Sequence, residues 1–376
     1  RGGEDTVVDA EVAALRERGH DVELHEAHNV DPGERAGGSR LTVARRAVWS
    51  RDAAEAVARH AREFRPDVAH VHNHAYELSA SIFPALAASG AAVVQTLHNY
   101  RMTCSNAYLL RDDRPCEDCV GSRAAWHGIQ HRCFRGSLSG STMLAAMQLA
   151  WRRGALQSVD RFIVLTEFAR EIFERVGVPS DRLVVRPNTI PDPGFTSAER
   201  DADAPLLFVG RLERAKGIDV LLDAWRDDDP RLLVAGSGPL QSELQPGAGV
   251  TMLGAQSAEQ VRELMAQARA LVVPSTWYEG FPMVILEAMA AGTPIVASDL
   301  GSLAEIVRDP ELGWRVPAGD AAALRDVLLR VAADPAESER RGAAARAAYE
   351  HDYVQPVVMD QLEQLYADAI AARSAC

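Results

Sequence analysis

Lysine is almost absent from this chain. Of its 40 basic residues only Lys216 is a lysine, and every other one is arginine. A lysine ammonium is a compact point charge on a flexible stem, so its use at one position points to a specific role there, such as contact with a phosphate group. Retention of a single lysine by chance is the alternative.

Long apolar runs and an excess of positive charge are missing as well. No apolar stretch approaches the roughly 18 residues that a membrane span needs, and no secretory signal opens the sequence. With 53 acidic against 40 basic residues the net charge is −13, which argues against a general nucleic-acid-binding protein. The composition, 47% hydrophobic and 25% charged over 376 residues, is typical of a globular protein with two or three domains. We expect a cytoplasmic location.

Cysteine is scarce and unevenly placed. Four of the five cysteines fall within an irregular stretch at about 100–140, namely Cys104, Cys116, Cys119 and Cys133. Their spacing, C-x11-C-x2-C-x13-C, can supply four thiolates to one tetrahedral zinc ion. Because sulfur would fill all four positions, such a zinc would be structural. Free thiols are the alternative, and two disulfides would require an oxidising compartment.

Short apolar runs alternate with helical patterns along most of the chain, as in a parallel α/β fold. Strands are predicted at 22–24, 67–72, 92–98, 160–165, 183–185, 205–210, 231–235, 250–254, 271–273, 294–298 and 314–316. The polar, proline-rich residues 191–205 are typical of a linker. The D-A-D sequence at 201–203 follows no strand, so we interpret it as a solvated charge run and not as a metal motif.

The stretch 270–292 carries the strongest functional signal. A buried strand is followed by a loop that contains Glu279 and three aromatic residues, and then by a helix that contains Glu287. In open α/β sheets ligands bind at the carboxyl ends of strands, and the N–H groups of a following helix suit a phosphate or a sugar. Two solvated glutamates are the alternative, although burial of an unpaired charge is costly. His98 likewise ends a predicted strand.

These motifs resemble those of the retaining glycosyltransferases of family 4. The specific part is E-G-F-P-M-V-I-L-E (279–287), an E-x7-E motif; G-R-L-E-R-A-K-G (210–217) is similar to the family's diphosphate loop, and R-P-N (186–188) to its interdomain strand end. The segment T-L-H-N-Y-R with the cysteine insertion is similar to a subgroup often met in bacterial polysaccharide and glycoconjugate synthesis. The family has a strand before the first glycine loop, and this sequence departs from it there.

The resemblance implies an α/β fold of the GT-B type, two facing Rossmann-like domains with a deep interdomain cleft. The domains expected are an N-terminal acceptor-side domain at 1–190, which contains the four-cysteine insertion, and a C-terminal nucleotide-sugar-binding domain at 205–352. The break around 353–356 then suits a final helix, 353–376, that crosses back to the N-terminal domain.

The resemblance also implies roles for single residues. His98 and Glu279 would act at the reacting sugar, while Arg211 and Lys216 would hold the donor diphosphate and replace a metal ion. The ribose would be bound by Glu287. The full set of implied donor-binding residues is Gly3, Asn188, Gly210, Gly254, Phe281, Pro282, Met283, Val284 and Glu287. No cofactor is expected for catalysis, and the attack would proceed from the front face with retention of configuration.

The partners expected are a nucleotide-diphosphate sugar, with UDP or GDP, and a saccharide, lipid-linked or glycoconjugate acceptor. A same-fold transferase on a small secondary-metabolite acceptor and a non-catalytic nucleotide-sugar-binding relative stay open as alternatives. Residues 35–65 hold eight arginines and three acidic residues. This basic face is consistent with peripheral contact at the inner face of a membrane, or with an ordinary solvated helix.

Overall fold

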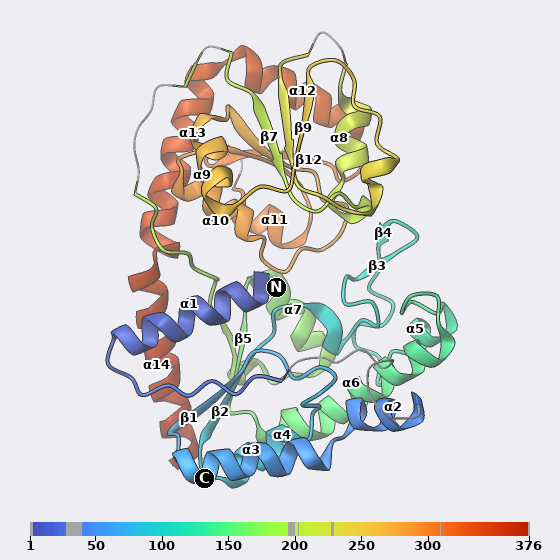
Figure 1. Ribbon diagram of the computed structural model, residues 1–376, viewed down its shortest axis with the longest axis vertical. Coiled ribbons are helices and arrows are strands. Elements are labelled where there is room, and N and C mark those ends of the chain that lie inside the picture. The colour runs from blue at the N-terminus through green and yellow to red at the C-terminus, as the bar shows by residue number, and fades with distance from the viewer. Residues whose placement is uncertain are drawn as a thin grey trace. The chain divides into compact units, whose positions relative to one another are not determined.

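Two parallel β-sheets organise the chain, one in each of two units (Figure 1). The computed structural model describes residues 3–27, 40–194, 200–201, 203–226, 229–308 and 310–374. Unit 1 comprises Arg1–Arg111, Cys116–Pro187 and Met359–Cys376, and unit 2 comprises Asp112–Pro115 and Asn188–Val358. Part of the predicted linker, 195–199, and Ala202 of the D-A-D sequence lie outside the described residues.

The sheet of unit 1 has the strand order β1-β2-β5-β6, and every pairing is parallel. Its strands are β1 (Val68–Val71), β2 (Ala92–Thr96), β5 (Arg161–Val164) and β6 (Leu183–Val185). All five residues of β2 are buried. This fits a central strand covered on both faces, in which every residue is buried and buried positions do not alternate with exposed ones.

Helices cover both faces of this sheet. They are α1 (Gly3–Glu17), α2 (Arg40–Val48), α3 (Arg51–Phe64), α4 (Ile82–Ala88), α5 (Trp126–Gln130), α6 (Leu138–Ser158) and α7 (Glu167–Val176), with the 3-10 turns η1 (Tyr100–Met102) and η2 (Ser180–Arg182) and the two-residue strands β3 (Leu110–Arg111) and β4 (Arg114–Pro115). Leu15 of α1 and Leu362 near the chain's end share one core cluster with Val94 and Ile163 of the strands. Leu144 of α6 lies in another cluster with Ala47 of α2.

The strand predicted at 22–24 is wrong. Residues 21–27 are extended but belong to no sheet. Within the described part of the chain β1 pairs only with β2, so the segment forms no ladder with the open edge of β1. A strand is defined by that pairing, and an apolar run without it has no partner for its backbone groups.

The sheet of unit 2 has six parallel strands in the order β12-β11-β10-β7-β8-β9. They are β7 (Leu206–Val209), β8 (Leu232–Ala235), β9 (Val250–Gly254), β10 (Ala270–Val273), β11 (Ile295–Ser298) and β12 (Gly313–Val316). The order reverses between β7 and β10, where the chain moves from one half of the sheet to the other. In doubly wound sheets the carboxyl ends at such a switch point are where ligands bind.

The helices of unit 2 form two layers. They are α8 (Ile218–Ala224), α9 (Ala258–Gln267), α10 (Met283–Ala290), α11 (Gly301–Ile306), α12 (Ala321–Ala333) and α13 (Pro335–Ala348), with the 3-10 turns η3 (Arg214–Lys216) and η4 (Pro239–Ser242) and the π-helical turn η5 (Tyr349–Tyr353). Helices α8 and α12 pack together against one face of the sheet, while α10 contacts α9 and α13 (Figure 1). Leu221, Leu324 and Val272 belong to one core cluster.

The last helix, α14 (Gln355–Ser374), begins in unit 2 and ends in unit 1, with the boundary between Val358 and Met359. Its buried residues Leu362 and Ala369 pack into the unit 1 core. None of the helices in the described part of the chain combines the length and the apolar character that a membrane crossing requires.

Candidate active site

The loops after β7 and β10 meet because these two strands are neighbours in the sheet. The backbone N–H of Thr276 donates to the carbonyl of Ala215 at 3.0 Å, and the Thr276 hydroxyl donates to the carbonyl of Arg214 at 3.2 Å. These bonds fix the turn η3 against the loop that precedes α10. The G-R-L-E-R-A-K-G and E-x7-E motifs, 63 residues apart at Lys216 and Glu279, therefore form one site in unit 2.

Glycine makes this close approach possible. Gly217 has φ of +70°, and a Cβ built on it would lie 1.9 Å from the carbonyl oxygen of Pro274. Gly236, which follows β8, is similar, because a Cβ there would lie 1.8 Å from the carbonyl oxygen of Gly210. Only a residue without a side chain lets backbone meet backbone at these two points.

Lys216 and Glu279 form an ion pair at the centre of the site. The Lys216 Nζ donates to both carboxylate oxygens of Glu279, at 2.8 and 3.0 Å. Glu279 is 4% exposed and also accepts hydrogen bonds from the Ser275 hydroxyl at 2.7 Å and from Trp277 Nε1 at 3.1 Å. The Lys216 ammonium lies 5.4 Å from the centre of the Trp277 ring. Glu279 thus fixes where the single lysine points.

Two further charged groups of unit 2 are far less engaged. The Arg211 side chain is 65% exposed, and its one ion pair, with Glu213, is long at 3.4 Å. Glu287 on α10 is half-buried and makes no side-chain hydrogen bond or ion pair with any residue that the structure describes. Burial raises the pKa of Glu287, and the charge of Arg262 only partly offsets the rise. Both groups are available to an additional ligand.

The start of α10 offers backbone donors beside these groups. Pro282 is its N-cap and supplies no side-chain hydrogen bond, so the first N–H groups, at Met283 and Val284, stay open to a ligand. Phe281 is buried, and its ring lies 6.0 Å from that of Tyr353. Gly210 and Gly254 both follow or end strands, at the carboxyl edge of the sheet. Asn188 is buried and begins the second segment of unit 2.

His98 lies in unit 1, two residues beyond the end of β2. Its Nε2 is 3.0 Å from Nδ1 of His72, which follows β1, and the two rings are stacked at 5.3 Å. Burial, reinforced by His72, lowers the pKa of His98 to about 3, so the imidazole is neutral at pH 7. Gly3, the other site residue predicted from this part of the chain, is the first residue of α1.

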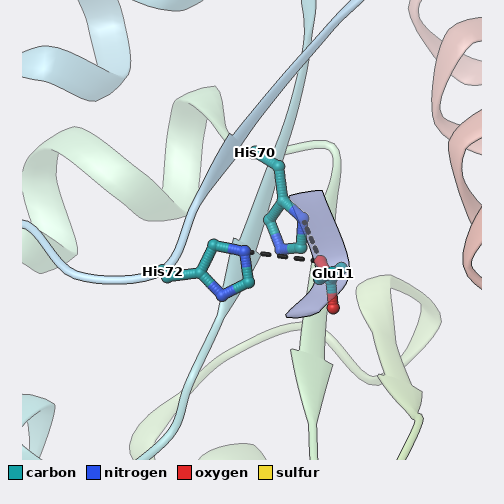
Figure 2. A group of neighbouring side chains, drawn as sticks. All are labelled: Glu11, His70 and His72. Carbon is teal, nitrogen blue, oxygen red and sulfur yellow. Dashed lines mark ion pairs between the residues drawn. The ribbon is translucent and has the colours of Figure 1, made fainter. Parts of the chain in front are cut away.

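Glu11 of α1 contacts both His70 and His72, whose ring centres lie 4.1 Å apart, as Figure 2 shows. Its Oε1 is 3.3 Å from His70 Nδ1 and 3.4 Å from His72 Nε2, and its Oε2 accepts from Arg186 Nη1 at 2.9 Å. Burial by itself raises the pKa of Glu11, but Arg186 and the two histidines outweigh it and hold this pKa well below its ordinary value. These three side chains are the one group of ligand-type residues, among those described, whose atoms all lie within 4.8 Å of one another.

Sequence reasoning missed Glu11, His70, His72 and Arg186. A signal was present, because D-V-A-H-V-H places its two histidines two residues apart on a strand and hence on one face. Glu11 interrupts the buried positions Val7, Ala14 and Leu15 of its helix, and a charge there requires a partner. The partner, Arg186, is 175 residues away, which no local pattern reveals.

The four cysteines of the insertion form no disulfide bond. Cys119 Sγ lies near Gly128, whose carbonyl accepts from the N–H of Cys133 at 2.9 Å. Burial raises the pKa of Cys119 to about 11, and the other three thiols add to the rise. The four therefore share one neighbourhood, but no three of them come within 4.8 Å of one another. The zinc site stays a prediction.

Two family models match consecutive parts of the chain. Residues 2–189, half of the chain, match the glycosyl transferase 4-like domain, and residues 195–349 match the glycosyl transferases group 1. The second match contains Lys216, Glu279 and Glu287, and the first contains His98 and the four cysteines. Both matches agree with the resemblance seen in the sequence motifs.

A curated relative is the phosphatidyl-myo-inositol mannosyltransferase of Mycobacterium leprae, which is 34% identical over 250 residues. The aligned stretch covers 62% of this chain and 65% of that protein, so it spans just under two thirds of the relative's length.

Solved structures support the fold. Sucrose-phosphate synthase from Thermosynechococcus elongatus has a TM-score of 0.70 at 22% identity, over 99% of this chain and 94% of that one. Anabaena Alr3699/HepE, solved in complex with UDP, has a TM-score of 0.61 at 17% identity, over 84% and 81%. The predicted α/β fold of the GT-B class is confirmed. The chain belongs to the glycosyl transferase 4-like family.

Proposed function

We propose that the protein is a retaining, metal-independent glycosyltransferase that moves a sugar from a nucleotide-diphosphate sugar to a saccharide, lipid-linked or glycoconjugate acceptor. The observation that carries the proposal is the site of unit 2, where Glu279 holds Lys216 at 2.8 Å. Arg211 lies exposed in the same motif as Lys216, and Glu287 follows in the helix after Glu279 and has no side-chain partner among the described residues. Two cations and a helix N-terminus suit a diphosphate, and an unpaired carboxylate suits the two hydroxyls of a ribose.

Metal independence follows from the same charges. Departure of a nucleoside diphosphate leaves negative charge on the β-phosphate, which either a divalent cation or fixed cations must stabilise. Arg211 and Lys216 supply two cations, of which Lys216 is fixed by Glu279. The D-A-D sequence is a poor alternative metal site, since the Asp203 side chain is 81% exposed and contacts Arg231.

The acceptor side is assigned to unit 1, with His98 as the group that meets the reacting sugar. The mannosyltransferase relative is named for phosphatidyl-myo-inositol, a lipid, and this name favours a lipid-linked acceptor here. Helices α2 and α3 carry the described arginines of the basic segment, among them Arg45, Arg46 and Arg51. Peripheral contact with anionic lipid at the inner membrane face is the partner interaction that we propose for them.

The insertion is proposed to hold a structural zinc ion through Cys104, Cys116, Cys119 and Cys133. The proximity of the Cys119 side chain and the Cys133 backbone to Gly128 supports this proposal, since it brings two of the four cysteines into one part of the insertion. Metal analysis of the purified protein tests it. We expect about one zinc ion per chain and a lower melting temperature after chelation. Purified protein that contains no zinc and whose melting temperature does not change on chelation would show that the four cysteines are ordinary thiols.

The activity is tested with a panel of UDP-, GDP- and ADP-sugars, read out by thermal shift and by donor hydrolysis. One nucleotide class is expected to raise the melting temperature and to be hydrolysed, and Lys216→Ala is expected to lose the hydrolysis. Arg231→Ala is the matched control, because this exposed cation precedes β8 and so lies at the opposite edge of the sheet. A thermal shift without hydrolysis by any donor would instead favour a non-catalytic nucleotide-sugar-binding protein.

A further inference from the structure

A chain of polar side chains in unit 1 leads from Arg186 through Glu11 and His72 to His98. Its links are Arg186 Nη1 to Glu11 Oε2 at 2.9 Å, Glu11 Oε1 to His72 Nε2 at 3.4 Å, and His72 Nδ1 to His98 Nε2 at 3.0 Å. Figure 2 shows the imidazole of His72 directed at the Glu11 carboxylate. The first three groups are assigned no part in the proposed function above.

The charge of Glu11 fixes the position of each proton along this chain. Glu11 is 5% exposed and paired with Arg186, so it is ionised and accepts hydrogen bonds only. The facing nitrogen of His72, Nε2, must therefore carry a proton. Arg186 already balances the charge of Glu11, and a neutral His72 leaves the group without net charge, so Nδ1 of His72 is an acceptor.

The same argument then determines the tautomer of His98. Two ring nitrogens 3.0 Å apart form a hydrogen bond only if one of them carries a proton, and here that one is His98 Nε2. A neutral imidazole holds one ring proton. Nδ1 of His98 is consequently a bare lone pair, and it forms no hydrogen bond with any residue in the described part of the chain.

We propose that Glu11 and His72 are positioning residues that hold His98 as the Nε2–H tautomer, so that its Nδ1 accepts a hydrogen bond from a hydroxyl group of the bound sugar or acceptor. The tautomer follows from unit 1 alone, whereas its use by a substrate hydroxyl rests on the proposed function. A tautomer selected in this way matches the wider rule that the partner of one ring nitrogen decides what the other can do.

A metal ion at Glu11, His70 and His72 is the competing explanation, and the contacts disfavour it. The guanidinium of Arg186 already pairs with Oε2 of Glu11 and balances the charge of this carboxylate, so a second cation on Oε1 would lie close to a fixed positive charge. Both nitrogens of His70 are also engaged, Nδ1 with the Tyr366 hydroxyl at 2.8 Å and Nε2 with the Thr96 hydroxyl at 2.7 Å. A hydrogen-bonded network accounts for all of these contacts without a cation beside Arg186.

The tautomer is measured directly by long-range ¹H–¹⁵N NMR on protein labelled with ¹⁵N-histidine. The signals of His98 and His72 are assigned by their loss in His98→Gln and His72→Phe. We expect one proton on each ring, at Nε2 in both residues. A proton on Nδ1 of His98, two protons on His72, or shifts that move on addition of zinc alone would each overturn the proposal.

Kinetics of His72→Phe test the use of the tautomer. Phenylalanine keeps an aromatic ring in the stack but removes the acceptor for His98, so we expect mixed His98 tautomers and a kcat about tenfold or more lower, with the donor KM within about twofold. His60→Phe is the control, since this half-exposed histidine pairs with Glu23 and stacks on Phe64. The His72→Phe protein could fold, show mixed His98 tautomers and still have an unchanged kcat. That result would contradict the proposal that a substrate hydroxyl uses Nδ1 of His98.

The two claims fail in different ways. If the wild-type protein turns over no donor, the proposed function fails while the NMR result still decides the tautomer. If turnover is normal but His98 carries its proton on Nδ1, the inference alone fails. A His72→Phe protein that does not fold leaves the wild-type spectrum as the deciding measurement.

Discussion

At the scale of single residues, the unusual feature is that the only lysine of the chain lies in the candidate site. Lys216 is held by Glu279 at two contacts, and the carboxylate in turn is held by Ser275 and Trp277. Such a buried acceptor network fixes a flexible ammonium in one place. A fixed cation stabilises developing charge without the cost of reorganisation, which is the condition for electrostatic catalysis.

Lys216→Ala is therefore expected to lower kcat by about 10²- to 10³-fold, the loss found when one preorganised charge-stabilising group is removed. Glu279→Gln is expected to cause a similar loss, since a neutral amide binds the ammonium less firmly. Steady-state kinetics with the best donor measure both. The kcat of Arg231→Ala should match that of the wild type. An equal loss of kcat in this control would mean that removing any positive charge has the same effect.

Replacing Glu287 by glutamine should have opposite effects on stability, which should rise, and on nucleotide binding, which should weaken. Its pKa is raised by burial, so its charged form destabilises the folded protein, and this penalty grows as the pH rises through the folded-state pKa. Glu287→Gln should raise the melting temperature at pH 7 and leave it nearly unchanged in acid, where both residues are neutral. Thermal scans across pH measure this effect.

The same Glu287→Gln protein should bind the nucleoside diphosphate about tenfold more weakly, because an amide oxygen accepts less strongly from a ribose than a carboxylate does. Calorimetric titration measures the affinity. Lower stability together with unchanged affinity would show that Glu287 has an unseen structural partner and no role in binding.

At the scale of elements, the site depends on the contact between the turn η3 and the loop before α10. Gly217→Ala places a Cβ where the Pro274 carbonyl stands and imposes φ of +70° on alanine. Gly319→Ala imposes a similar φ, +78°, with nothing within 4 Å of the new Cβ. The control should cost about 1 kcal/mol, whereas Gly217→Ala should cost several times more and abolish donor binding.

Urea unfolding and donor titration separate these two glycine variants. If Gly217→Ala and Gly319→Ala were equally stable, the two loops would move apart at no cost in free energy. The close approach at Gly217 would then contribute nothing to stability.

The pairing of α1 with the end of β6 supplies a second prediction about elements. Arg186→Met leaves Glu11 buried without its cation, and breaking a buried pair costs about 3–5 kcal/mol. Arg46→Met removes an exposed pair with Asp52, whose side chain is 74% exposed, and should cost about 1 kcal/mol or less. Urea unfolding at pH 7 compares the two variants.

The loss of stability caused by Arg186→Met should depend on pH in a definite direction. In the wild type the pKa of Glu11 is depressed, so its stabilisation is present above the unfolded-state pKa and is lost as the pH falls through the folded-state value. In Arg186→Met the buried carboxylate of Glu11 has no cation beside it to offset the cost of its burial. Protonation of Glu11 should therefore restore part of the lost stability. The destabilisation should therefore be smaller at pH 4 than at pH 7, and a larger one in acid would contradict this account.

At the scale of the whole molecule, what could be predicted from the sequence was what local patterns encode. Buried parallel strands are mostly apolar, so ten of the eleven strands predicted, β1 and β10 among them, have counterparts near their expected positions. Gly217 and Glu279 lie in short motifs whose glycines and charges predict a ligand-binding loop. The fold and the position of the candidate site of unit 2 could be predicted from such signals.

What could not be predicted depends on partners that are distant in the sequence. The run at 22–24 has strand composition, yet it joins no sheet, because composition alone does not provide the ladder of backbone hydrogen bonds with a neighbouring strand. Glu11 and Arg186 find each other only when the sheet of unit 1 is assembled. Likewise the spacing of four cysteines permits a zinc site but does not determine the distances between the thiols.

The central claim is sugar transfer with retention and without a divalent metal ion. It is tested most directly by NMR of the product formed from an α-linked nucleotide sugar in the presence of EDTA. An α-anomeric product, formed at the rate seen without EDTA, is the predicted result. A β-anomeric product, or a reaction that stops with EDTA and resumes with added magnesium, would contradict the account.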